Sequence, residues 1–205
     1  MGDSFTTTFD AVEKGIKYLK RFSGRKAIVL FSDGELYGIH ASAKSNLRDA
    51  EEQEALIYTI RFGEYPTHQP GYSIANLPRR QSPGFIGDRN RSGDSEIITK
   101  SDLDMLGKSS VLSKKDKAKL IEKVNAYMIG LADRTGGRNF QVDQINDLES
   151  AFSSVAGELG EQYLIGYSPT KEGKDGERRR ITVKVNIPNV AVRSRNEVIY
   201  KKPKK

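Results

Sequence analysis

The 205-residue sequence predicts an α/β protein with a doubly wound, mostly parallel sheet, followed by an antiparallel β extension at the C-terminal end. Amphipathic segments with helical spacing alternate with short apolar runs over residues 1–160. The apolar runs are continuous rather than alternating, as is typical of parallel strands covered on both faces. After residue 160 this rhythm ends, so we expect one domain over 1–160 and a β extension with a basic tail over 161–205.

The first helix and the first strand are predicted at residues 10–22 and 27–31. Apolar side chains recur at helical spacing at Phe9, Val12, Ile16, Leu19 and Phe22, and Lys and Glu lie on the opposite face. This pattern indicates an amphipathic helix that packs on a core. Ser23-Gly24 ends it, and the apolar run AIVLF that follows predicts an interior strand.

Two further helix–strand pairs and a last helix continue the same order. They are predicted as helix 45–54 with strand 55–62, helix 116–133 with strand 139–142, and helix 145–158. Thr135-Gly136-Gly137 stands where a helix C-cap requires glycine. Between residues 64 and 113 lies a Pro- and Gly-rich insertion, for which we expect a long flexible loop, or else a partner-binding or lid role.

The C-terminal extension is predicted to contain three strands, at 162–167, 180–187 and 190–200, packed on the sheet edge. Its basic residues account for much of an overall charge of +7, from 34 Lys and Arg against 27 Asp and Glu. A solvated strand face with a charged tail explains this excess. The alternative is a polyanion site, although stacking aromatics are not interleaved among the basic residues, which argues against nucleic acid.

The composition also limits the chemistry that the chain can perform. Without cysteine it has no disulfide and no thiolate ligand or nucleophile. No apolar run is long enough to span a bilayer. Ser32 beside Asp33 lacks a nucleophile-elbow pattern, and His40 and His68 have no second ligand at metal-binding spacing, so we expect a protein that is not an enzyme.

Several segments together resemble the bacterial family related to the von Willebrand factor A (VWA) domain. They are AIVLFSDGEL, ALIYTIRFGE, IGLADRTGGRNFQV, DLESAFSSVAGEL, QYLIGYSPT, DGERRRITVKV and VAVRSR, in that order. The resemblance covers most of the chain outside the 64–113 insertion. It implies a VWA or Rossmann-like domain that binds a protein partner and performs no catalysis. Members of this family are often exported, which favours a periplasmic or cell-surface location.

The resemblance also implies a metal-ion-dependent adhesion site, where Mg²⁺, or Mn²⁺ or Ca²⁺, bridges the domain to an acidic group of its partner. Asp33 matches the Asp that follows the family's fourth strand, and Thr6 matches the Thr of the preceding loop, with Thr7 and Thr8 as neighbouring alternatives. Outside such a site, Asp33 would bond to the amides of the following turn, and Thr6 would cap a helix.

The family's Asp-x-Ser-x-Ser element and the central strand that carries it are not found in the sequence. By the resemblance, the chain is an N-terminally truncated VWA domain, or else a family member that has lost these elements by descent. In either case its metal site is incomplete, and we expect it to bind no cation by itself. Strand 27–31 would then lack a neighbour and expose backbone and apolar surface, which favours association. The alternative functions are metal-independent binding through the 64–113 loop and polyanion binding by the basic C-terminal segment.

Overall fold

The computed structural model describes residues 8–33, 41–63, 98, 113–200 and 202. Thr6, both histidines and nearly all of the 64–113 insertion therefore lie outside the described residues. The elements follow the predicted order: α1 (Thr8–Leu19), β1 (Ala27–Ser32), α2 (Ala43–Glu52), β2 (Leu56–Phe62), α4 (Lys114–Thr135), β3 (Asn139–Val142), α5 (Ile145–Gly160), β4 (Arg178–Arg180) and β5 (Glu197–Ile199). Among the described residues, no helix is long and apolar enough to cross a membrane.

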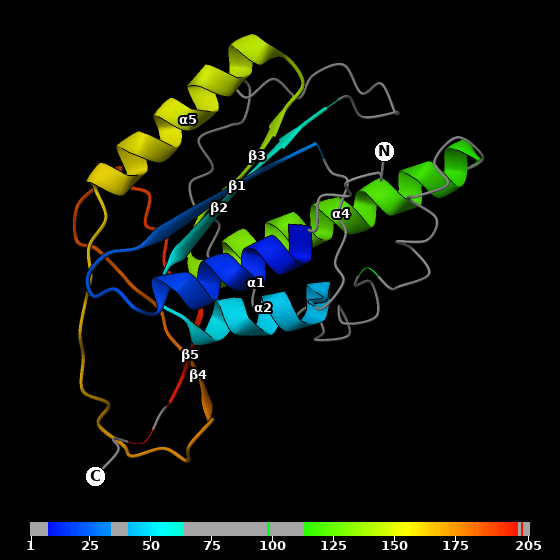
Figure 1. The fold of residues 1–205 in the computed structure, drawn as a ribbon. Helices are drawn as coiled ribbons and strands as arrows, with labels where there is room; N and C mark the ends of the chain where they lie inside the picture. The colour runs from blue at the N-terminus through cyan, green and yellow to red at the C-terminus, as the bar shows by residue number, and fades with distance from the viewer. Residues whose placement is uncertain (1–7, 34–40, 64–97, 99–112, 201, 203–205) are drawn as a thin grey trace.

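The protein is α/β, with a three-stranded parallel sheet in the order β1-β2-β3 and a separate antiparallel pair, β4-β5. Helices α1, α2 and α4 cover one face of the parallel sheet, and α5 covers the other (Figure 1). The predicted parallel sheet with helices on both faces is confirmed. Strand 139–142 has the predicted bounds. Most helix ends differ from the prediction by two residues, and α1 ends three residues earlier than predicted.

The larger core lies between the sheet and the three-helix face. Phe9, Val12 and Ile16 of α1 are buried there, as the helical spacing predicts. They meet the buried side chains of α2, α4 and β2, which include Leu47, Val124, Met128, Leu131 and Ile57. Because all three helices turn an apolar stripe to the same core, burial of these stripes fixes how the helices pack on the sheet.

A polar network crosses this core and joins α1, α2 and α4. The Asn46 amide is fully buried and donates to the Phe9 carbonyl at 3.0 Å and to the Tyr127 hydroxyl at 2.9 Å. The Asp10 carboxylate accepts a bond from the Ala41 amide at 2.7 Å. Burial raises the pKa of Tyr127 well above its usual range. The network links the three helices by directional bonds in addition to apolar contact.

A second core lies between the sheet and α5. Tyr58, Ile60, Phe140 and Val142 point to this face and pack against Ala151 and Val155 of α5, among other side chains. These strand residues all belong to β2 and β3, which are the two strands that α5 mainly contacts. The α5 face of β1 is therefore covered much less.

The end of α4 is locked to the start of β2. Gly136 adopts the left-handed conformation of a helix C-cap, with φ of 82°. The buried Thr135 hydroxyl accepts a bond from the Ile57 amide at 2.9 Å, and a Cβ on Gly137 would lie 2.1 Å from the Ile57 carbonyl oxygen. The Thr-Gly-Gly run is thus a helix end that presses directly against a strand backbone.

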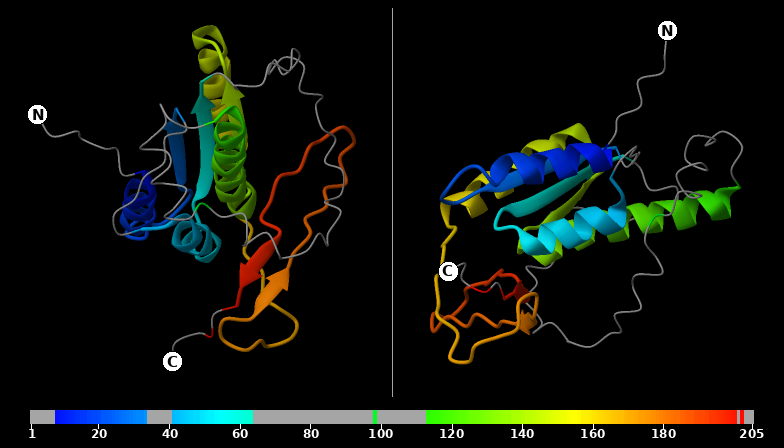
Figure 2. Two further views of the ribbon diagram at one scale, coloured as in Figure 1. Left: turned by 90° about the vertical axis from the view of Figure 1, so that its right-hand side faces the viewer. Right: turned by 60° about the horizontal axis from the view of Figure 1, so that its bottom comes forward.

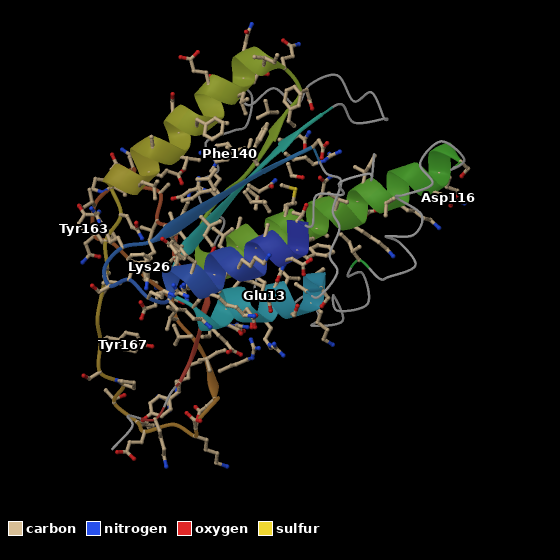
Figure 3. The ribbon with its side chains drawn as sticks, in the orientation of Figure 1. Glu13, Lys26, Asp116, Phe140, Tyr163 and Tyr167 are labelled. Atoms are coloured by element: carbon tan, nitrogen blue, oxygen red, sulfur yellow. The ribbon has the colours of Figure 1, made fainter. Side chains whose placement is uncertain are left out.

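The C-terminal extension contains less strand than predicted. The expected strands at 180–187 and 190–200 are reduced to the three-residue strands β4 and β5, and no strand forms at 162–167. Residues 163–170 are all exposed, and Tyr163 and Tyr167 project from the chain that leaves α5 (Figure 3). The prediction was wrong here because strand propensity yields a strand only where a second backbone pairs with the first.

The extension docks at the amino ends of the parallel strands (Figure 2). The Arg195 guanidinium donates to the Ala55 carbonyl at 3.4 Å, just before β2. Arg193 lies 3.8 Å from Glu158 of α5, and Ser194 packs against Gly136. Three consecutive residues therefore attach the extension to the domain.

Strand β1 differs from its prediction in one respect. It is a strand, as expected, but within the described part of the chain it pairs with β2 alone and forms an edge of the sheet. Val29 is 39% exposed and Phe31 48% exposed. Burial on both faces was therefore a wrong expectation for β1, whereas the exposed apolar surface expected of a strand without a second neighbour is present.

The contact between Gly137 and Ile57 leads to a test of the fold. Gly137→Ala should lower the free energy of unfolding by about 3 kcal/mol or more, because a methyl group cannot fit against the Ile57 carbonyl without moving backbone. Urea unfolding followed by circular dichroism measures the change. Gly157→Ala is the matched control, since its Cβ meets nothing within 4 Å in α5, and it should stabilise by about 0.5–1 kcal/mol. Equal effects of the two substitutions would contradict this packing.

Candidate functional site

The carboxyl ends of β1, β2 and β3 meet at one edge of the sheet, where ligands of open α/β sheets usually bind. The strand register places Ser32 beside Arg61, and Arg61 beside Gln141. Laterally paired residues in parallel strands point to the same face, so these three side chains form a row on the α4 side. We call this region, with Asp33, Gly63 and Asp143 just beyond the strands, the carboxyl edge.

Asp33 lies where the sequence places it, directly after β1 and at the carboxyl edge. Its side chain is exposed, and its backbone carbonyl lies opposite Gly63, whose added Cβ would sit 3.7 Å from it. Gly63 has φ of 136°, a conformation that favours glycine, so the turn after β2 brings its backbone close to Asp33. Thr6, the predicted second ligand, lies outside the described residues.

Arg61 is a buried cation at the carboxyl edge, on the face of the sheet that α4 covers. Its guanidinium donates to the Asn125 side-chain oxygen at 3.4 Å and to the Gln141 side-chain oxygen at 3.3 Å. Gln141 in turn donates to the Gly63 carbonyl at 2.9 Å and to the Asp143 carboxylate at 3.1 Å. The ends of β2 and β3 are thus joined to each other and to α4 by one polar network.

The described carboxylates do not form a complete metal site. Asp33 follows β1 and Asp143 follows β3, with β2 between them, so the two strands lie about 10 Å apart. Within the described ranges, no group of three or more His, Cys, Asp and Glu side chains is placed to hold a metal. Asp33 is one suitable ligand, and more would be required.

A second polar site is a groove between α2, the end of α4 and β4. Its volume is about 360 Å³. It is lined by four cationic side chains, one carboxylate, two serines and one leucine: Ser42, Lys44, Ser45, Leu47, Arg48, Glu51, Arg134 and Arg178. We call it the basic groove. Lys44 and Arg48 are exposed at its α2 side, so it presents positive charge to solvent.

Glu51 organises the basic groove. Its two carboxylate oxygens bond to Arg134 of α4 and to Arg178 of β4, so a single acid joins the domain to the extension. The hydrogen bond to Glu51 is the main reason that the pKa of Arg178 is raised. Since one carboxylate faces several cations, the groove keeps a positive excess.

Comparison of the chain with protein-family models, with curated proteins and with solved structures finds no match.

Sequence reasoning placed Asp33 correctly but missed Arg61 and the basic groove. The signal for Arg61 was available, because it is a single charged residue inside the apolar run ALIYTIRF, and a charge in a buried strand is uncommon unless it has a specific partner. The groove offers no such signal, because Lys44, Arg134 and Arg178 come together only through folding.

Because the described residues supply one suitable carboxylate, we expect the chain to bind Mg²⁺ or Mn²⁺ only weakly. Titration calorimetry should give a dissociation constant weaker than roughly 0.1 mM for either ion. Asp33→Asn should leave the heat signal in that range nearly unchanged. A one-to-one site tighter than this, abolished by Asp33→Asn, would show that further ligands complete the site.

Proposed function

We propose that this protein is a non-catalytic, VWA-like protein-interaction module and that the carboxyl edge of its parallel sheet is the recognition surface. The observation that carries the proposal is the position of Asp33, an exposed carboxylate at the end of β1 beside the turn at Gly63. Open α/β sheets present their binding residues at this edge because the loops that leave the strands converge there.

The arrangement of the edge supports recognition of a protein partner. The network from Asn125 through Arg61 and Gln141 to Gly63 ties the ends of β2 and β3 to α4, which favours a preorganised surface beside Asp33. By the family resemblance, the ligand is an acidic group of the partner, held through Mg²⁺ or a similar divalent ion. Asp33 fits the role of one residue that holds the ion. The described residues do not provide the other ligands that such an ion needs.

Selection of peptides tests this proposal directly. A random peptide library displayed on phage is selected on the protein in Mg²⁺, and the enriched peptides are measured against variants. With Mg²⁺ at millimolar concentration, above the weak dissociation constant expected for the ion alone, we expect peptides rich in Asp and Glu whose carboxylates complete the site. Their binding should be at least tenfold weaker to Asp33→Asn and after chelation of the ion. Glu149→Gln removes an exposed carboxylate from α5 and is the matched control, expected to bind normally. Peptides that bind Asp33→Asn and the parent protein equally would reject the carboxyl edge as the site.

The basic groove favours a second candidate function, the binding of a polyanion. Its four cationic side chains include Arg178 of the basic C-terminal segment, and α2 contributes two exposed cations. Contacts with phosphate or sulfate groups release counterions, so such binding weakens steeply as salt rises.

Retention on heparin distinguishes this function from the first. If the groove binds polyanions, Lys44→Gln combined with Arg48→Gln should elute at clearly lower salt than the parent protein. The control combines Lys14→Gln with Lys20→Gln, which removes the same charge from two exposed positions, one in α1 and one just after it. Equal elution of the two double variants would mean that net charge, not the groove, causes retention.

A further inference from the structure

We propose that residues 163–167 add to the open edge of β1 as a fourth parallel strand, so that this chain closes its own sheet. In the described arrangement these residues leave α5 and stay exposed, while β1 exposes the edge that they would cover. The proposal concerns the C-terminal extension and does not depend on the function proposed for the carboxyl edge.

The edge of β1 has the backbone groups that a further strand needs. The Leu56 amide donates to the Lys26 carbonyl at 3.0 Å, so the even-numbered residues of β1 direct their backbone groups toward β2. Backbone direction alternates along a strand, and the odd-numbered residues Ala27, Val29 and Phe31 therefore direct theirs to the open edge. These three residues can form about six hydrogen bonds with a parallel neighbour, two for each.

The side chains beside this edge are apolar on both faces. Val29 and Phe31 point to the α5 face, where Phe31 lies 6.2 Å from Phe152 and 6.3 Å from Phe62, measured between ring centroids. Ile28 and Leu30 point to the opposite face and pack against the core beneath α1. A strand added here has to be apolar on both faces, as interior parallel strands are.

Residues 163–167, with the sequence YLIGY, meet this requirement. Tyr163 is 86% exposed and Ile165 is 67% exposed, and their apolar surface has no cover in the described arrangement. The run has five residues against six in β1, and Pro169, which has no amide to donate, follows it closely. Length and chemistry therefore match the open edge.

A contact already present sets the register. The Arg25 guanidinium donates to the Gln162 carbonyl at 2.8 Å, which holds the start of the YLIGY run near the start of β1. Continuing in parallel places Ile165 beside Val29. Tyr163 and Tyr167 then lie on the α5 face, and Leu164 and Gly166 lie on the side of α1. Glu161 falls beside Arg25, whereas an antiparallel strand would bring Glu161 toward Asp33 and the like charges would repel.

The connection through α5 has the handedness that parallel sheets require. The chain passes from β1 to β2 and from β2 to β3 with α2 and α4 on one face. To reach the far side of β1 from β3, the chain has to move back across the sheet, opposite to its direction from β1 to β3. Helix α5, which makes this connection, lies on the face opposite to α2 and α4 (Figure 1). Reversing both the direction and the face preserves a right-handed crossover, which nearly all parallel connections adopt.

Engineered cysteines test this register, since the chain has none of its own. Val29→Cys combined with Ile165→Cys should form an intramolecular disulfide under mild oxidation, because lateral neighbours lie about 4.8 Å apart, within the range that a disulfide spans. The matched control pairs Val29→Cys with Ile187→Cys, whose parent side chain is similarly exposed at 62%. Non-reducing electrophoresis and mass spectrometry of the dilute protein give the rate and the linkage.

The expected result is a disulfide within one chain that forms at least tenfold faster than in the control pair. Equal rates in the two pairs would overturn the proposal, because general flexibility would explain both. A disulfide that joins two chains would also overturn it, since the edge would then accept a second copy instead of its own segment.

Amide exchange provides a test that needs no cross-link. In the proposed register the Val29 amide donates to Leu164, and the Leu164 amide donates to Ala27. Leu164→Pro removes that second donor and should speed exchange at Val29 at least tenfold. The Ile60 amide of β2 is the internal reference and should keep its rate. If Val29 exchanges as fast in the parent protein as in the variant, the segment does not pair with β1.

Discussion

The backbone of β2 is the element on which the rest of the structure depends. Among the described strands it alone is paired on both sides, with β1 through one set of peptide groups and with β3 through the other. The first residues of β2 come before its pairing with β3 begins at Thr59, so the Ile57 amide has no partner in β3. The Thr135 hydroxyl takes that amide instead, and Gly137 allows the helix end to approach. The path of α4 into β3 follows from this contact.

The position of β2 also determines where the polar residues gather. Its carboxyl end brings Arg61 between the ends of the neighbouring strands and under α4, while Gly63 brings the following turn close to Asp33. An exposed carboxylate and a buried guanidinium therefore share one edge of the sheet. Arg61 and its amide partners hold the ends of β2 and β3 in place, and Asp33 meets solvent at the end of β1, which supports the recognition role proposed for this edge. The basic groove, in contrast, depends on how the extension docks through Glu51.

Much of the fold could be predicted from the sequence, because its strongest signals are local. The helical spacing in α1, the apolar run of β1 and the glycines after α4 each require one backbone conformation. The site was predictable in part, since Asp33 follows a recognisable strand. Arg61 was harder, because its role depends on Asn125 and Gln141, which come from distant segments. The strands at 180–187 and 190–200 were predicted too long because this segment has strand-like composition but few backbone partners, and pairing is not a local property.

Backbone amide exchange along β2, followed by nuclear magnetic resonance, tests the central claim that β2 is the middle strand. If it is, even-numbered amides donate toward β1 and odd-numbered amides toward β3 or Thr135, so every amide from Leu56 to Phe62 should exchange slowly. Alternating slow and fast exchange along this strand would show that it has a neighbour on one side only. That result would contradict the sheet order and the carboxyl edge built on it.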